Sequence, residues 1–157
     1  MPEPLDQQFS KTYLYRLHSL TNTLDKAFDT ILHIHASLTL PQFMLLIAVS
    51  EHRAINQRQA AQFLGLSAVA IKRQTDIAID NQWLKREKTA ILPGHTLSLT
   101  PKGQTAIQNG LQALEQHLFK VFSDSSRHAD LMTHLDVLHN HTKGVIDEQL
   151  ILRQRKK

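Results

Sequence analysis

The chain of 157 residues contains no cysteine, only five glycines and five prolines, and no long apolar run. Without cysteine it cannot form structural disulfides, thiolate metal sites or a thiol redox switch. Its longest apolar run, Phe43–Val49, is far shorter than the about 20 residues that a membrane-spanning helix needs. The N-terminal segment has neither the basic nor the apolar region of a secretory signal. These absences predict a cytoplasmic globular protein with no membrane partner.

Positive charge is concentrated in the middle of the chain. Between Arg53 and Lys88 there are seven bases and three acids, and the resulting local charge of +4 equals the net charge of the whole chain. A basic segment of this kind suits a surface that binds nucleic-acid phosphates. A solvated charged face is the alternative interpretation of the same count.

Two helices are predicted before the basic segment. Apolar residues recur at helical spacing from Leu5 to Leu38, which predicts one long helix. Thr39 as the N-cap and Pro41 in the first turn then predict a second helix through the apolar run.

Two shorter helices joined by a tight turn are predicted next. Asn56 can cap the first, with Gln59 completing a capping box, and Gly65 can end it in a left-handed conformation. Ser67 caps the second, which runs to about Asn81. This order predicts a helix-turn-helix, in which the second helix enters the major groove of DNA.

A hairpin and two further helices complete the expected order. Strands at 83–88 and 96–99 flank a turn at Pro93-Gly94, and Thr100-Pro101 opens the next helix. After a break at 123–126 a last helix is expected. Both helices carry apolar stripes, formed by Ile107, Leu111, Leu114, Leu118 and Phe122 in the first, and by Leu131, Leu135, Leu138, Val145, Ile146 and Leu150 in the second.

The long terminal helices carry more apolar surface than the small centre can cover, so we expect them to pack against a second copy of the chain. The predicted fold is therefore mainly α with a small β-hairpin wing. Residues 1–38 would form an N-terminal dimerisation helix, residues 39–100 a winged helix-turn-helix domain that binds DNA, and residues 101–157 the C-terminal dimerisation helices.

The second helix of the helix-turn-helix has one face suited to the core and one suited to DNA. Ile71, Thr75 and Ala78 recur at helical spacing and would face the core. On the opposite side small residues allow close approach to a groove, apolar groups can touch a thymine methyl, and two bases can meet phosphate or guanine. These residues are Ala68, Val69, Lys72 and Arg73. An ordinary amphipathic helix with a solvated Lys-Arg pair is the alternative.

Bases on either side of this helix extend the expected DNA surface. Lys85, Arg86 and Lys88 lie on the first strand of the hairpin, which can serve as a wing along the DNA backbone. Arg58, at the start of the preceding helix, is a further candidate for a phosphate contact.

Three motifs follow one another along the chain: LTLPQFMLL, INQRQAAQFLGLSAVAIKRQTD and LSLTPKGQTAI. With these motifs in this order, the chain resembles the multiple antibiotic resistance regulator (MarR) family. The resemblance covers almost the whole chain. It implies a dimer of winged helix-turn-helix subunits that binds a pseudo-palindromic DNA site. It also implies a repressor that a small, often aromatic, ligand releases from DNA.

The resemblance also assigns roles to residues. It maps polar DNA-reading positions onto Ser67, Lys72 and Arg73, and an ion pair that braces the wing onto Asp76 and Arg86. By analogy, the ligand pocket would draw on the first two helices, at Tyr13, Leu17, Phe43 and Leu46.

The wing tip departs from the family pattern. It reads TAILPGH, without the usual aspartate and arginine, and His95 is the nearest polar substitute. Wing contacts would then depend on the bases of the first strand. The apolar tip also motivates a rival hypothesis, a dimeric protein-interaction module that has kept the fold and lost DNA reading.

No enzyme and no cofactor are predicted, because the chain has no phosphate-binding glycine loop, no nucleophile elbow and no cysteine nucleophile. The ten histidines lack the i, i+4 spacing that clamps a metal on one helix, so no metal site is predicted. A site assembled across helices, from His33 or His35 with His117, is the alternative.

Overall fold

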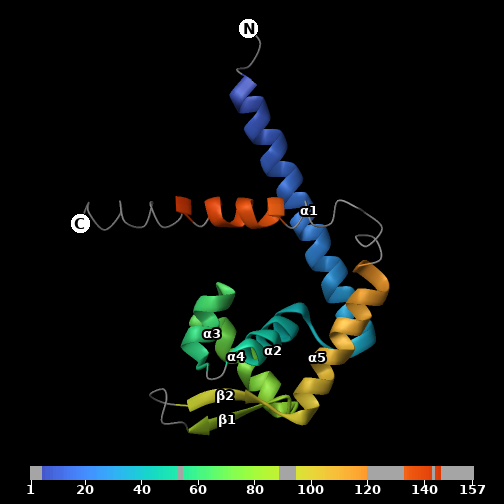
Figure 1. The fold of residues 1–157 in the computed structure, drawn as a ribbon, viewed down its shortest axis with the longest axis vertical. Helices are drawn as coiled ribbons and strands as arrows, with labels where there is room; N and C mark the ends of the chain where they lie inside the picture. The colour runs from blue at the N-terminus through green and yellow to red at the C-terminus, as the bar shows by residue number, and fades with distance from the viewer. Residues whose placement is uncertain (1–4, 53–54, 89–94, 120–132, 143, 146–157) are drawn as a thin grey trace, which may run out of the picture. The chain divides into compact units, whose positions relative to one another are not determined.

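The structure, a computed structural model, describes residues 5–52, 55–88, 95–119, 133–142 and 144–145. The chain divides into two compact units, Met1–His117 and Leu118–Lys157. Figure 1 shows the helices and the hairpin of the first unit. The predicted boundaries at residues 38 and 100 both fall within this unit, so the separate roles of these segments stay predictions.

The first two helices are α1 (Leu5–Ala36) and α2 (Leu40–Glu51). The predicted cap of α2 is present: Thr39 Oγ1 accepts from the backbone N–H of Gln42, whose side chain accepts in return from the backbone N–H of Thr39. α1 ends before the predicted Leu38 because Ser37 adopts a left-handed backbone conformation with φ of 55°. The chain therefore turns sharply from α1 into α2.

The helix-turn-helix consists of α3 (Gln57–Leu64) and α4 (Ala68–Asp80). Asn56 and Gln59 form the predicted capping box, with distances of 2.9 and 3.1 Å. Gly65 ends α3 with φ of 64°, a conformation that glycine adopts without strain. Ser67 caps α4 by accepting from the backbone N–H of Ala70 at 3.1 Å. These cap predictions are confirmed.

The wing is an antiparallel pair of strands, β1 (Leu84–Lys88) and β2 (His95–Leu99). Residues 89–94, which include the predicted Pro93-Gly94 turn, lie outside the described part. Ile55 forms an isolated bridge with Leu97, and its carbonyl accepts from the Leu97 N–H at 2.8 Å. This bridge, which was not predicted from the sequence, fixes the start of α3 beside the wing.

Helix α5 (Pro101–Leu114) begins at the predicted Thr100 cap and continues into a π-helical turn, η1 (Glu115–Phe119), which was not predicted. Of its expected apolar stripe, Ile107 and Leu114 are buried but Leu111 is 47% exposed. Small residues instead bring α5 close to the core: a Cβ added at Gly110 would lie 2.6 Å from the Phe43 ring. The Leu118 side chain and Phe122 lie outside the described residues.

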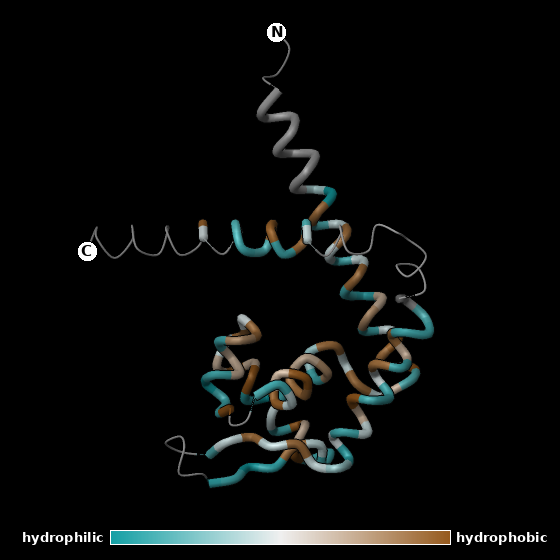
Figure 2. The backbone as a smooth tube through the Cα atoms, in the orientation of Figure 1, coloured by the Kyte–Doolittle hydropathy of each residue, from teal (hydrophilic) through white to brown (hydrophobic). Residues whose placement is uncertain are grey.

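One core joins the end of α1 to α2, α4 and the base of the wing. Figure 2 shows that α2 is hydrophobic over most of its length, as expected for a central helix. The largest fully buried side chains of this core are Leu32, Leu38, Leu45, Leu46, Ile55, Ile71 and Leu84. Among the described residues no single helix meets the length and hydropathy needed to cross a membrane, and the one pair that meets them jointly, within α1 and α2, is bent by 81°.

In the second unit, residues 133–142 and 144–145 are helical and exposed. They belong to the predicted last helix. Leu131, Ile146 and Leu150 of its expected stripe, and the break at 123–126, lie outside the described residues.

Candidate nucleic-acid interface

Helix α4 presents the two faces that were expected. Ile71, Thr75 and Ala78 are buried, and the Thr75 hydroxyl donates to the Ile71 carbonyl at 2.8 Å, so this polar group is satisfied inside the core. Ala68, Val69, Lys72 and Arg73 are all exposed, Val69 by 79%. The first turns of α4 therefore offer small and apolar groups followed by two bases, with Ser67 exposed at the cap.

Arg58 and Lys72 both line a hollow of about 490 Å³ between α3 and α4. Gly65 in the turn and Ala68 at the start of α4 also line it. The predicted base of α3, Arg58, thus lies at the same hollow as Lys72 of α4.

Asp76 is bonded to two of the predicted DNA contacts at once. Its Oδ1 accepts from Arg86 Nη2 at 2.7 Å, which is the ion pair between α4 and the wing that the resemblance implied. Its Oδ2 accepts from Lys72 Nζ at 2.9 Å, one turn earlier on α4. The hydrogen bonds from Lys72 and then Arg86 hold the pKa of this carboxyl below its ordinary value of 3.8. Asp76 is therefore ionised at neutral pH and links α4 to the wing.

A second carboxylate pairs with a wing base. Lys85 forms a salt bridge with Glu87 on the same strand. The hydrogen bond from Lys85 lowers the pKa of Glu87. Lys88 is exposed at the end of β1. Two of the three predicted wing bases, Lys85 and Arg86, thus have an acidic partner in the chain itself, which was foreseen only for Arg86.

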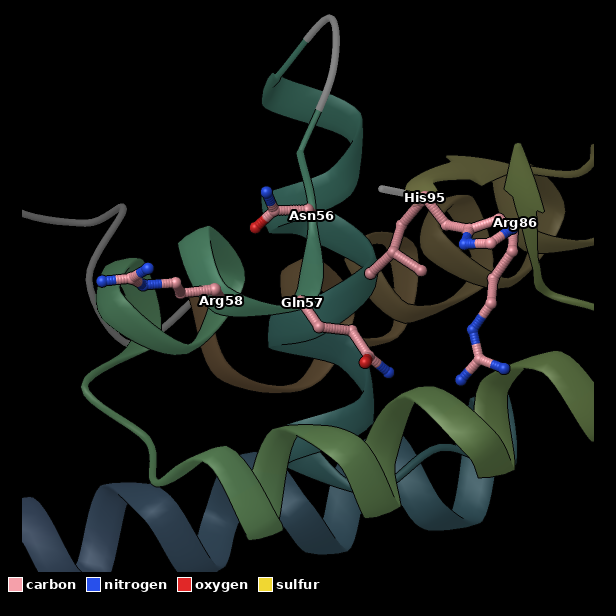
Figure 3. A pocket seen from close by; sticks show the side chains of 6 residues that line it. Asn56, Gln57, Arg58, Arg86 and His95 are labelled. Atoms are coloured by element: carbon pink, nitrogen blue, oxygen red, sulfur yellow. The ribbon is translucent and has the colours of Figure 1, made fainter. Parts of the chain in front are cut away.

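A larger hollow, of about 690 Å³, lies between the start of α3 and the wing, and Figure 3 shows it from close by. It is lined by Asn56, Gln57, Arg58, Arg86, His95 and Leu97. The side chains of Gln57 and Arg86 extend toward α4, whereas Arg58 points away from them (Figure 3). Gln57 Nε2 is buried and has no hydrogen-bond partner among the described residues. Gln57 was not predicted from the sequence, because the bridge between Ile55 and Leu97 brings the start of α3 to the wing.

The structure describes the side chains of three of the four predicted ligand-pocket residues. Phe43 and Leu46 are buried in the core, whereas Leu17 is 43% exposed. Leu17 precedes the core residue Leu32 by fifteen positions on α1, which corresponds to about 22 Å of helix. The Tyr13 side chain lies outside the described part. The pocket therefore stays a prediction.

Of the two histidine pairs considered for a metal site across helices, one is in contact. The rings of His35 and His117 stack with centroids 4.3 Å apart and an angle of 16° between their planes. Within the described ranges no group of three histidine, aspartate or glutamate side chains is arranged to hold a metal ion.

Together α3, the turn at Gly65, α4 and the hairpin form a winged helix-turn-helix. Solved structures share this architecture over most of the chain. BldR, a transcriptional regulator from Sulfolobus solfataricus, is 18% identical, with a TM-score of 0.74 over 90% of this chain and 99% of BldR. MarR from Staphylococcus aureus, solved in complex with salicylate and kanamycin, is 14% identical, with a TM-score of 0.73 over 88% of this chain and 93% of that one. MosR from Mycobacterium tuberculosis, solved in complex with DNA, is 17% identical, with a TM-score of 0.66 over 84% of this chain and 96% of MosR.

A scan against protein-family models and a search of curated proteins both found no match. At the identities of the solved structures the likeness concerns the fold. The chain has the winged helix fold of the MarR-family transcriptional regulators, mainly helical with one small hairpin, and the predicted fold class is confirmed.

Proposed function

We propose that this chain is a homodimeric, non-enzymatic regulator of transcription that binds double-stranded DNA and acts in the cytoplasm. The observation that carries the proposal is the exposed first half of α4, where Ala68 and Val69 precede Lys72 and Arg73 on a helix whose other face is buried. The basic strand of the wing lies beside the same helix through the pair of Arg86 with Asp76. The arrangement fits a helix in the major groove with a wing on the backbone.

The exposed side chains of α4 are suited to two kinds of contact with DNA. Ala68 and Val69 fit the methyl group of thymine, because they are small or apolar and exposed at the end that enters the groove. Lys72 and Arg73 supply positive charge for phosphates and hydrogen-bond donors for guanine. Ser67 caps the helix through its oxygen lone pair, so its hydroxyl proton is available to a phosphate. Arg58, Lys85 and Lys88 add backbone contacts on either side.

Homodimerisation is supported by apolar side chains that the single chain leaves exposed. Those on α1 include Tyr15, Leu17, Leu20 and Ile34, and those on the helical residues after 132 include Leu135, Val137, Leu138 and Val145. Exposure of so many large apolar groups on two helical segments is typical of a surface that a partner covers. A symmetric dimer would present two α4 helices to a pseudo-palindromic site.

We further propose that the protein is a repressor and that a small aromatic ligand releases it from DNA. The support is analogy of fold: the S. aureus MarR structure contains salicylate and the M. tuberculosis MosR structure contains DNA. Fluorescence titration of the purified chain with salicylate, followed by a gel shift at saturating ligand, tests the idea. Loss of the DNA complex on ligand binding is expected. DNA affinity that is unchanged at saturation would exclude release by this ligand.

The DNA-binding proposal is tested by a gel shift with the DNA upstream of the protein's own gene. The double variant Lys72→Ala with Arg73→Ala should lose most of its affinity. A matched control, Arg16→Ala with Lys26→Ala, removes the same charge from exposed positions on α1. Because α1 is also the proposed dimer surface, size-exclusion chromatography first checks that this variant is a dimer, and it should then bind as the native chain does. Equal affinities of the two double variants would contradict a DNA-reading role for α4.

The alternative function is a dimeric protein-interaction module of the same fold. It is favoured by the wing bases that are already paired within the chain, Lys85 with Glu87 and Arg86 with Asp76, and by the exposed Val69. Failure of the native chain to shift any duplex at low salt would favour this module over a DNA-binding regulator.

A further inference from the structure

One carboxylate, Asp76, stands between the two parts of the molecule that would touch DNA. It lies on α4 itself and accepts from Lys72 of the recognition helix at 2.9 Å and from Arg86 of the wing at 2.7 Å. Each of its two oxygens has one of these partners. The three side chains therefore form one connected group, and the distance between the lysine and the arginine is set by the carboxylate between them.

All three side chains are open to solvent. The side chain of Lys72 is 70% exposed, that of Arg86 41% and that of Asp76 39%. Exposed ion pairs of this kind are weak, so DNA phosphates can compete for both bases. A lysine has three N–H donors and an arginine has five. Each base can therefore bind Asp76 and a group on DNA at the same time.

We propose that Asp76 is a specificity-determining residue. It holds Lys72 and Arg86 at one distance from each other, and it competes for both bases with phosphates that do not match this distance. The inference rests on the proposed DNA-binding function and goes beyond bracing of the wing. On a matching site both bases contact DNA while still paired with Asp76, so little side-chain order is lost on binding. On other sequences the same bases reach phosphates only by leaving Asp76.

Without the carboxylate, the two bases become independent and mobile. Non-specific binding consists almost entirely of phosphate neutralisation, and each added phosphate contact steepens the slope of log affinity against log salt by about 0.9. Asp76→Asn should therefore strengthen binding to unrelated DNA and steepen that slope by about 0.9 to 1.8. Binding to the preferred site should gain less or weaken, because the orientation of the two bases is lost.

The chain offers a matched control on the same helix. Asp80 lies one turn further along α4, is exposed, and has no ion pair within the described ranges. Asp80→Asn removes the same charge without freeing Lys72 or Arg86. Asp76→Glu keeps the charge and the possibility of both pairs.

The test compares two duplexes by fluorescence anisotropy at several salt concentrations. One is the best site selected by the native chain from a random pool, and the other is its scrambled version. For Asp76→Asn the ratio of the two affinities should fall about threefold more at about 50 mM salt than at about 200 mM salt, because one added phosphate contact changes affinity by roughly that factor over this range. Asp80→Asn and Asp76→Glu should keep ratios near the native one. In a Lys72→Ala background the effect of Asp76→Asn on the ratio should shrink, because one of the two freed bases is gone.

A native ratio in Asp76→Asn, or an equal fall in Asp80→Asn, would overturn the inference while leaving the DNA-binding function intact. Absence of site preference in the native chain would overturn the proposed function itself. Circular dichroism and thermal unfolding of each variant distinguish a change in DNA reading from loss of the fold.

Discussion

Gly103 is the position at which one added methyl group should most clearly lower the stability of the fold. It belongs to the LTPKG stretch and lies in the first turn of α5. A Cβ added there would lie 2.1 Å from the carbonyl oxygen of Trp83 and 2.9 Å from a methyl group of Leu99. The Trp83 carbonyl is held in place, because it accepts from the backbone N–H of Thr100 at 3.0 Å and from its hydroxyl at 3.2 Å.

The size of the effect follows from the contact. To reach even 3.0 Å, the start of α5 or the base of the wing must move by about 0.9 Å. Overpacking of this kind costs about 1–3 kcal/mol or more, whereas alanine in place of glycine within a helix gains up to about 1 kcal/mol. We therefore expect Gly103→Ala to lower the free energy of unfolding by about 2 kcal/mol. For a unit of this size that corresponds to a fall in Tm of about 5–10 °C.

Thermal unfolding followed by circular dichroism measures the change. Gly144→Ala is the control, because Gly144 is also helical and a Cβ there would meet nothing within 4 Å. The control should unfold at or slightly above the native temperature. A Gly103→Ala variant that is as stable as the native chain would refute the close approach of α5 to the wing base.

Three further predictions concern stability. Asn56→Ala should cost about 1 kcal/mol in urea unfolding, because it removes the cap of α3, and an unchanged midpoint would contradict that role. Leu46→Ala should cost about 2–5 kcal/mol, because Leu46 is fully buried, whereas Met44→Ala on the exposed side of α2 should cost much less. Equal losses in these two variants would contradict the orientation of α2. Hydrogen bonds from Lys72 and then Arg86 lower the pKa of Asp76 below 3.8 in the folded chain. The stability that the Asp76 carboxylate contributes should therefore be complete above pH 3.8, and it should be lost as the pH falls below the pKa that Asp76 has in the folded chain. The native chain should therefore be more stable than Asp76→Asn at pH 6, and the gap should close below pH 3.8; a gap that persists in strong acid would contradict the assignment.

Local chemistry explains what could be predicted from the sequence. Asn56 with Gln59, Gly65 and Ser67 act within one helical turn, so their cap geometry does not depend on the rest of the fold. Helical spacing likewise identified the buried face of α4, since a residue such as Thr75 keeps its side of the helix wherever the helix packs. The order of the elements followed from these signals.

Contacts between distant segments explain what could not be predicted. The pairing of Ile55 with Leu97 depends on a single residue, which has no periodic signal of its own. Exposure of Leu111 follows from the close approach of α5 at Gly110, which turns another side of the helix inward. The pair of Lys72 with Asp76 has ordinary i, i+4 spacing on a helix and could have been found by examining charge spacing along α4.

The measurement that tests the central claim most directly is the salt dependence of DNA affinity. If α4 contacts DNA through Lys72 and Arg73, replacing both with alanine should reduce the slope of log affinity against log salt by about 1 to 2. The charge-matched variant Arg16→Ala with Lys26→Ala, checked to be a dimer by size-exclusion chromatography, should keep the native slope. A native slope in the Lys72→Ala, Arg73→Ala variant would contradict the account, because these bases would then not meet DNA.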